Sequence, residues 1–400
     1  MRYIKDEVID IIDKKKKMAF IAGPRQVGKT TFVQHLLKEV SVQDGYYNWD
    51  IETHRQKIIK DPLHFWVNSP MPSRIVLDEI HKYPRWKRLL KGFYDENKGK
   101  TEILVTGSGR LDVYQRGGDS LFGRYHLFHL FPYSVGEMEN KNICPPSPKD
   151  CIQKIFDHPK ETHAFESLWK LNGFPEPLFA GTEKELIQWQ NDHRQLILKE
   201  DMRDLTQIRE LGLVEMLTGL LPERVGSPLS INALRETLNV NFNSVKNWLM
   251  VLDRLYYLFL VSPYSGKLSR ALRREQKVYF YDWAELEDES KRLENLVAVH
   301  LKKACAFWTD AGYGTFDLRF VRDKEKREVD FLICDKNKPF ILVECKISLK
   351  DIDPSLIYFK ERLKPTYSFQ VGTSFEKDYL AEKKEGIYLC HAARFLAALP

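Results

Sequence analysis

Eight residues near the N-terminus, Gly23 to Thr30, restrict the architecture of this chain. They read G-P-R-Q-V-G-K-T and fit the pattern G-x-x-x-x-G-K-[ST]. A short apolar run, residues 18–22, precedes them, and a helical pattern over residues 31–37 follows. Glycines let a loop backbone wrap around phosphate groups, and the N-terminus of the next helix offers free N–H groups to an anion. The order strand, loop and helix therefore predicts an α/β fold with a phosphate-binding loop.

The residues of this loop have separate predicted tasks. Lys29 can reach the β- and γ-phosphates of a nucleotide, and the hydroxyl of Thr30 can ligate Mg²⁺. A chance glycine-rich turn is the alternative, but it does not explain a strand before the loop and a helix after it. We expect the following residues at the nucleotide: Gly23, Pro24, Arg25, Gln26, Val27, Gly28, Lys29, Thr30 and Thr31.

A second apolar run, residues 74–77, ends in two acidic residues, Asp78 and Glu79. Asp78 is expected to hold Mg²⁺ through water, and Glu79 to orient or deprotonate the water that attacks the phosphate. The second carboxylate favours a hydrolase over a protein that only holds a nucleotide. A solvated acidic strand end is the alternative. Residues 78–81 also spell D-E-I-H, a helicase-type box, but we find no further helicase motif.

Several motifs together resemble one family. A third apolar run, residues 102–106, leads into the turn T-G-S, and residues 123–137 follow the pattern G-R-x-x-x-x-x-L-x-P-x-S-x-x-E. With the G-P-R-Q-V-G-K-T loop, the strand I-V-L-D-E-I-H-K and G-F-P-E-P at 173–177, they resemble the prokaryotic AAA-type ATPases. The resemblance extends over nearly the whole chain. It implies ATP as the nucleotide and ATP hydrolysis as the activity.

The same resemblance implies roles for residues after the third run. Thr106 or Ser108 would lie at the sensor position near the γ-phosphate. Arg124 would be a catalytic arginine finger, in cis or in a neighbouring subunit, that neutralises charge developing on the transferred phosphoryl group. A structural salt bridge is the alternative for Arg124. The sequence departs from the family at Gly109 and Arg110, where many relatives have small hydroxyl residues. A finger acting in trans would require a homo-oligomer.

Composition limits the remaining classes. The chain has 400 residues, 43% of them hydrophobic and 30% charged, which predicts a globular protein of two to four domains. Its six cysteines form no C-x-x-C pair, so neither a zinc site nor a disulfide framework is indicated. No apolar run approaches the ~18–20 residues that a spanning helix needs, and the first residues lack an apolar signal core. We expect a cytoplasmic protein without a membrane partner.

The middle of the chain predicts a helical lid and then a winged helix. The cluster C-P-P-S-P at 144–148 breaks the pattern, and the following residues have helical period. Further on, two helical patterns flank an asparagine-rich turn, as in a helix-turn-helix, and two strand patterns would form its wing. These helices are predicted at 230–238 and 243–254, and these strands at 256–261 and 277–281.

The charge of the chain is concentrated in this region. The net charge is +6, and residues 224–280 hold nine Lys and Arg against three acidic residues. Basic side chains can neutralise phosphates and asparagines can reach base edges, so this distribution favours DNA binding. Winged helices also bind proteins, and a basic run is often a solvated face; both alternatives stay open. The predicted DNA-binding residues are Asn243, Lys246, Asn247, Lys267, Arg270, Arg273 and Arg274.

The C-terminal region carries a third candidate site. An amphipathic helix over 293–303 contains Glu294, and two later strand patterns carry Asp330, Glu344 and Lys346. The pattern D-x₁₃-E-x-K resembles the PD-(D/E)xK endonuclease-like superfamily. Asp330 and Glu344 would hold Mg²⁺ or Mn²⁺, Lys346 would position water or stabilise charge, and Glu294 would add a ligand. The alternatives are a structural charge network or an inactive nuclease-like module that binds a partner.

The sequence thus predicts four domains: a P-loop ATPase core (1–145), a helical lid (146–222), a winged helix (223–284) and a restriction-endonuclease-like α/β domain (285–400). The leading hypothesis is an AAA-type ATPase that engages DNA through the winged helix, with metal-dependent DNA cleavage left open. The alternative is a nucleotide-switched module whose nuclease-like domain is inactive and docks a protein partner.

Overall fold

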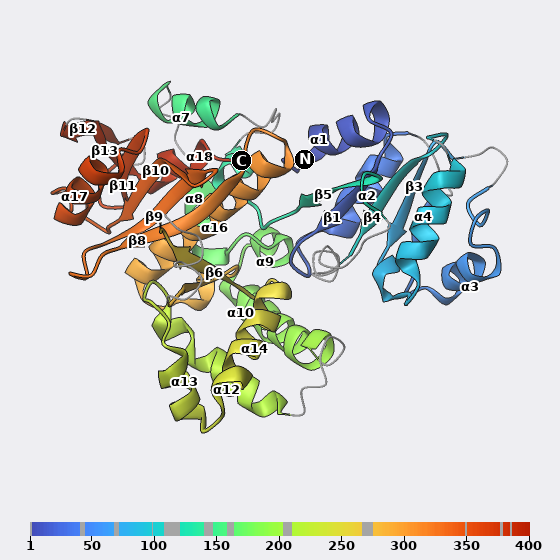
Figure 1. Ribbon diagram of the computed structural model, residues 1–400, viewed down its shortest axis with the longest axis horizontal. Coiled ribbons are helices and arrows are strands. Elements are labelled where there is room, and N and C mark those ends of the chain that lie inside the picture. The colour runs from blue at the N-terminus through green and yellow to red at the C-terminus, as the bar shows by residue number, and fades with distance from the viewer. Residues whose placement is uncertain are drawn as a thin grey trace. The chain divides into compact units, whose positions relative to one another are not determined.

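A computed structural model of the chain describes residues 2–40, 45–67, 72–97, 99–107, 121–139, 147–157, 164–202, 210–265, 275–348, 350–376, 379–384 and 386–400. They divide into two compact units, Met1–Phe131 and Pro132–Pro400, shown as ribbons in Figure 1 and described here one at a time. The first unit ends earlier than residue 145, the predicted end of the ATPase core, because the chain after Phe131 packs within the second unit. There, the backbone N–H of Tyr133 donates to the carbonyl of Gly173.

The N-terminal unit is built on a parallel five-stranded sheet of order β2-β3-β4-β1-β5. Its strands are β1 (Met18–Ala22), β2 (Tyr46–Asn48), β3 (Arg74–Asp78), β4 (Glu102–Thr106) and β5 (Tyr125–His129). Its helices and helical turns are α1 (Lys5–Ile9), η1 (Asp10–Lys14), α2 (Lys29–Lys38), α3 (Glu52–Lys60), η2 (Ile80–Lys82) and α4 (Trp86–Asn97).

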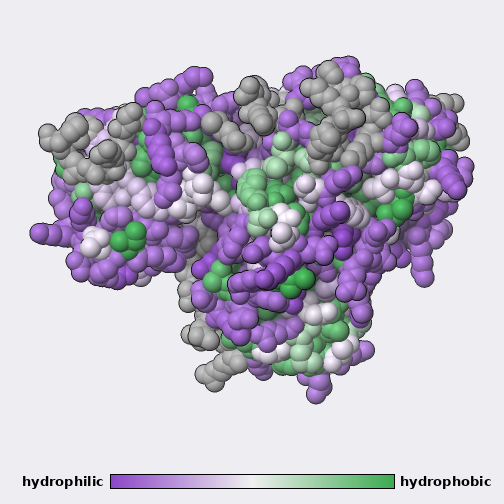
Figure 2. All heavy atoms as spheres, turned by 180° about the vertical axis from the view of Figure 1, so that it is seen from behind, coloured by the Kyte–Doolittle hydropathy of each residue, from purple (hydrophilic) through white to green (hydrophobic). Residues whose placement is uncertain are grey.

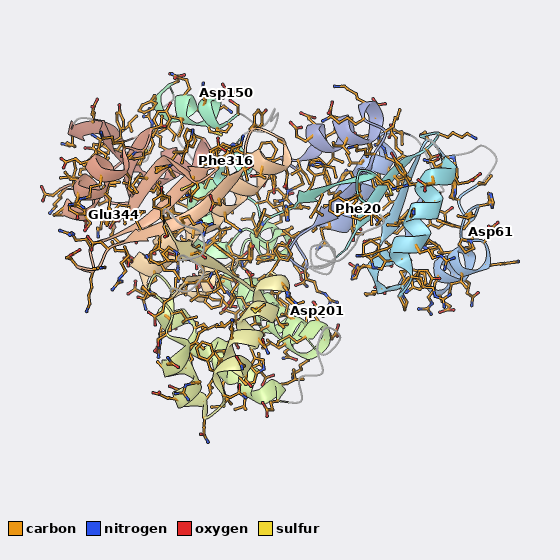
Figure 3. All side chains as sticks on the ribbon, viewed as in Figure 1. Phe20, Asp61, Asp150, Asp201, Phe316 and Glu344 are labelled. Atoms are coloured by element: carbon orange, nitrogen blue, oxygen red, sulfur yellow. The ribbon has the colours of Figure 1, made fainter. Side chains whose placement is uncertain are left out.

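The strands at the centre of this sheet are buried on both faces. Every residue of β1 and β3 is buried, as their continuous apolar runs predict for a parallel sheet covered by helices. Helix α4 packs on one face, where the ring of Trp86 lies near that of Phe20, which is labelled in Figure 3. Because the strands are parallel, the carboxyl ends of β1, β3 and β4 lie at the same edge, and the loops there can meet one ligand.

The second unit combines helices with a larger sheet. Its helices and helical turns are α6 (Val135–Glu139), α7 (Pro148–Asp157), α8 (Ala164–Leu171), α9 (Pro175–Ala180), α10 (Glu183–Gln195), η4 (Leu196–Asp201), α12 (Leu211–Leu220), η5 (Pro222–Arg224), α13 (Ile231–Leu238), α14 (Phe242–Arg254), η6 (Trp283–Glu285), α16 (Glu289–Asp310), α17 (Pro354–Leu363) and α18 (Ala392–Ala397). Its strands are β6 (Leu258–Pro263), β7 (Lys277–Phe280), β8 (Phe316–Arg322), β9 (Glu328–Asp335), β10 (Lys338–Cys345), β11 (Tyr367–Gly372), β12 (Leu380–Lys384) and β13 (Ile387–His391).

One sheet runs through most of this unit, with the order β12-β13-β11-β10-β9-β8-β6-β7. The predicted wing strands β6 and β7 pair with each other, and β6 also pairs with β8 through Ser262 and Pro263. The predicted domain boundary between residues 284 and 285 therefore separates β7 from β8, although both strands belong to the same sheet. A two-stranded hairpin is marginally stable by itself, and pairing with β8 gives it a larger sheet.

The two helices predicted for the helix-turn-helix are present. The hydroxyl of Ser230 accepts a hydrogen bond from the N–H of Ala233 at the start of α13, and Asn239 ends that helix in the left-handed conformation. The side chain of Asn241 accepts from the N–H of Ser244 and starts α14. The asparagine-rich turn is thus formed by capping residues, which explains its composition. The two wing strands are predicted to be joined by a basic loop, residues 265–274, of which residues 266–274 lie outside the described residues.

Hydrophilic residues cover much of the face drawn in Figure 2, with smaller hydrophobic patches between them. No helix in the described ranges is long and apolar enough to cross a membrane.

Candidate functional site

The loop between β1 and α2 has a backbone that requires glycine at two positions. Gly23 has φ +150°, and a Cβ added there would lie 2.1 Å from the carbonyl oxygen of Leu130. Gly28 has φ +92° and precedes the first residue of α2, Lys29. Side chains are strained in these conformations, so both glycines of the motif are explained by the path of the loop. The loop leads directly into the N-terminus of a ten-residue helix.

Lys29 lies across this loop and is largely buried. Its Nζ donates hydrogen bonds to the carbonyl oxygens of Gly23 (3.0 Å) and Pro24 (2.6 Å). Arg2, from the start of the chain, donates to the carbonyls of Val27 (2.8 Å) and Phe131. The arginine therefore links the loop to the segment after β5 and stabilises the backbone of the loop. The sequence motif does not include Arg2, and no local pattern marks it.

The carboxylate of Asp78 collects three hydroxyl groups at the end of β3. Oδ2 accepts from Thr30 Oγ1 (2.8 Å) and from the hydroxyl of Tyr46 (2.7 Å), while Oδ1 accepts from Thr106 Oγ1. Strand β4 lies between β1 and β3, and this order places Thr106 beside the two motifs. Tyr46 was not predicted from the sequence; it ends up here because β2 pairs with β3. Burial, together with Asp78, raises the pKa of Tyr46, so its hydroxyl stays a donor.

The groups around Asp78 suit a magnesium ion. Mg²⁺ prefers hard oxygen ligands and retains several water molecules. Thr30 and Asp78 supply a hydroxyl and a carboxylate oxygen beside the phosphate-binding loop. These two residues would hold Mg²⁺ when a nucleotide binds.

Glu79, the residue predicted to act on the attacking water, lies in a strained and partly buried position. It is the residue after β3 and adopts φ +54°, a strained conformation for a non-glycine residue, while its N–H donates to the carbonyl of Thr106 (3.1 Å). Burial raises the pKa of Glu79, and Lys29 opposes this shift. His81 Nε2 lies 3.5 Å from a carboxylate oxygen of Glu79. A desolvated carboxylate held in a fixed position can orient or deprotonate water.

Arg124 and Ser108 complete the predictions for this unit. Arg124 is the residue before β5, and its carbonyl accepts from the N–H of Met18, at the opposite end of β1 from the phosphate-binding loop. Its guanidinium pairs with Asp95 at 2.8 Å. The structure therefore does not bring Arg124 to the loop of its own chain, and the salt-bridge alternative describes its contact. Ser108, Gly109 and Arg110 lie outside the described residues.

The parallel sheet, the glycine loop with Lys29, and the Thr30–Asp78 pair define a nucleotide-binding domain with a phosphate-binding loop. Comparison with known families agrees. Residues 15–139 match the family model of an AAA domain, which supports an AAA-type P-loop ATPase domain in this part of the chain. Residues 162–286 and 290–391 each match a family described only as a domain of unknown function (DUF8612 and DUF4143). No curated protein matches the chain.

The C-terminal candidate residues lie together in the second unit. Asp330 on β9 and Glu344 on β10 are on neighbouring antiparallel strands, and the N–H of Asp330 donates to Glu344 Oε2 (3.3 Å). Of the two, Glu344 is labelled in Figure 3. Lys346 Nζ lies 2.9 Å from Glu344 Oε1 and 3.1 Å from Asp353 Oδ2. Burial raises the pKa of Glu344 well above its usual range, and the negative charge of the neighbouring Asp330 adds to this effect. The sequence pattern D-x₁₃-E-x-K therefore does predict a real spatial cluster.

A second lysine, absent from the sequence prediction, lies inside this cluster. The side chain of Lys277 on β7 is 0% exposed, and its Nζ lies 3.2 Å from Glu294, 2.8 Å from Glu328 and 3.2 Å from Asp330. Burial disfavours its charge, but the three carboxylates more than offset this and raise the pKa of Lys277. Glu328 could have been noticed, because it is two residues before Asp330 and thus on the same face of its strand.

The predicted metal site at Asp330 and Glu344 is not supported. Within the described parts of the chain, no group of three or more His, Cys, Asp or Glu side chains is arranged to hold a metal ion. The carboxylates that would form one are already engaged by lysines, and the main chain N–H of Cys345 donates to Asp330 Oδ2 (3.0 Å). The residues present therefore do not fit a bound Mg²⁺ or Mn²⁺, and we derive no cleavage chemistry from them.

The predicted DNA-binding residues are described in part. Asn243, Lys246 and Asn247 are exposed on α14, whereas Val245 and Trp248 on the same helix are buried. The three exposed residues follow helical spacing and share one face. Lys267, Arg270, Arg273 and Arg274 lie outside the described residues. Lys277 contributes to the basic charge of the region, but its burial among carboxylates removes it from any external surface.

Proposed function

We propose that this chain binds and hydrolyses ATP at the loop of residues 23–30. The observation that carries the proposal is the hydrogen bond between Thr30 and Asp78, which joins the phosphate-binding loop to the acidic end of β3. The AAA-domain match over residues 15–139 supports the ATPase class. The choice of ATP over GTP rests on the resemblance to AAA-type ATPases.

The side chains divide the work of phosphoryl transfer. Lys29 would exchange its bonds to the loop carbonyls for bonds to the β- and γ-phosphates and would stabilise their charge. Glu79 would orient the attacking water and accept its proton. Thr106 fixes the orientation of Asp78 through a hydrogen bond. A bound Mg²⁺ would neutralise charge on the phosphate oxygens.

Replacing Glu79 with glutamine tests whether Glu79 accepts the proton of the attacking water. Because glutamine keeps the shape but cannot accept the proton, we expect ATP turnover to fall by about 10²–10⁴-fold with nucleotide affinity retained. Since burial raises the pKa of Glu79 from 4.5, the carboxylate protonates at a higher pH than an ordinary glutamate, and turnover should decline on acidification while the pH is still above 4.5. Phosphate release, measured across pH, and binding of a fluorescent ATP analogue check this.

Glu96→Gln is the matched control, because Glu96 is an exposed glutamate on α4 of the same unit. Wild-type turnover in Glu79→Gln would show that another group activates the water.

We further propose that α14 contacts DNA. The exposed face with Asn243, Lys246 and Asn247 has the composition of a recognition helix, and the helix-turn-helix geometry supports this use. Phe242 and Met250 are also partly exposed on this helix, and a cavity of about 530 Å³ lies beside it, lined by both. This apolar contribution favours a protein partner, and the docking alternative is tested by the same measurement.

Lys246→Ala should weaken DNA binding in a salt-dependent way. If Lys246 neutralises one phosphate, the slope of log K against log salt concentration should shrink in magnitude by about 0.9. Fluorescence anisotropy with a labelled duplex at several salt concentrations measures this slope. Lys338→Ala, which removes an exposed lysine on β10, is the control. An unchanged slope would place the DNA contact elsewhere, and no DNA binding at low salt would favour the nucleotide-switched docking module.

A further inference from the structure

The carboxylate cluster of the second unit contains a cation supplied by the chain itself. Lys277 is the first residue of β7, and its side chain is fully buried. Its ammonium group contacts carboxylates from two other elements, Glu294 on α16 and both Glu328 and Asp330 on β9. The ammonium group thus supplies these carboxylates with positive charge, which a divalent cation bound to carboxylate oxygens would otherwise supply.

We propose that the ammonium group of Lys277 replaces a metal ion in this nuclease-like cluster, so that the site binds no divalent cation. The distances of 2.8 to 3.2 Å are within the range of N–H···O hydrogen bonds. A buried ammonium without a partner would be costly, and so would three partly buried carboxylates without a cation; the contact compensates both groups.

The neighbouring groups extend this compensation. Arg322 Nη1 lies 2.6 Å from Glu328, and the hydroxyl of Tyr279 donates to Glu294 (2.7 Å). Lys346, the lysine of the nuclease-like pattern, is held between Glu344 and Asp353. Both lysines therefore have carboxylate partners. The cluster joins β7 to α16 and β9, which is a structural task.

Binding of Mn²⁺ tests the proposal. The full chain is used without nucleotide and in an Asp78→Asn background, so that the phosphate-binding loop adds no metal site. Electron paramagnetic resonance of free Mn²⁺ gives the binding isotherm. We expect Asp330→Asn to leave the isotherm of the parent unchanged. A Mn²⁺ site in the parent that Asp330→Asn removes would overturn the proposal.

Lys277→Gln gives the converse test. Removing the ammonium leaves the carboxylates without their cation, so this variant should gain a Mn²⁺ site, and adding Asp330→Asn should remove it again. Mn²⁺ should also raise the melting temperature of Lys277→Gln but not that of the parent. Lys338→Gln, at an exposed lysine, is the control and should gain nothing. A folded Lys277→Gln without a new site would overturn the proposal; if circular dichroism shows it unfolded, the comparison of the parent with Asp330→Asn decides.

Discussion

Lys29→Ala is expected to lower ATP turnover by at least about 10²–10³-fold, the usual cost of removing one preorganised charge at the reacting group. The largely buried Nζ of Lys29 is held by two carbonyls of the loop, so it is already at the phosphate site before a nucleotide arrives. Alanine cannot replace this charge, and the side chains of Thr30 and Asp78 provide no positive group. Nucleotide affinity should fall as well, because the interaction begins in the ground state.

Phosphate release and binding of a fluorescent ATP analogue measure the two effects separately. Lys38→Ala is the matched control, because Lys38 is an exposed lysine at the end of the same helix. Circular dichroism establishes that both variants are folded. Undiminished turnover in Lys29→Ala would contradict the proposed ATPase site, whereas equal losses in both variants would indicate damage to α2 rather than loss of a phosphate contact.

Lys303→Met is expected to destabilise the second unit by about 3–5 kcal/mol, the cost of leaving a buried charge without its partner. Lys303 on α16 is buried, and its Nζ donates to the carboxylate of Glu137 and to Ser134 Oγ (2.9 Å). Glu137 is also buried. It belongs to the G-R…S-x-x-E motif, and this contact gives the acidic residue of that motif a structural explanation. Denaturant unfolding followed by tryptophan fluorescence measures the loss.

The double variant Lys303→Met/Glu137→Leu should recover part of the loss, because it removes both charges and not one. Lys302→Met, at the neighbouring and partly exposed position, should change the free energy of unfolding much less. A loss below about 1 kcal/mol in Lys303→Met, the range of exposed ion pairs, would contradict a buried pair at this position.

Local patterns predicted the parts of this molecule that depend on neighbouring residues. The loop from Gly23 to Thr30 needs left-handed or extended glycines and a helix directly after it, and both are visible in sequence. The asparagine caps at the end of α13 and the start of α14 also follow from short-range rules, as does the face shared by Asn243 and Lys246. The acidic end of β3 could be predicted because the apolar run of residues 74–77 is followed directly by Asp78.

Contacts between distant residues could not be predicted in this way. Tyr46 contacts Asp78 because β2 pairs with β3. The hydrophobic pattern of each strand does not reveal which strands are neighbours in the sheet. Lys277 is one of the nine basic residues of 224–280 whose concentration favours DNA binding, although the pairing of β6 with β7 places it among carboxylates. Arg124 pairs with Asp95 on α4, a partner that depends on how the helix packs. The DNA-binding and docking interpretations stay predictions.

The strand β6 gives the second unit a mechanical property. Three residues separate it from the end of α14, and its own hydrogen bonds attach it to β7 on one side and to β8 on the other. A connection this short allows little independent movement of the two elements. The hydrogen bonds of a sheet oppose separation of its strands, because several must break together. We therefore expect α14 to move little relative to β6. A displacement of α14 on ligand binding would therefore also displace β6 and the strands paired with it.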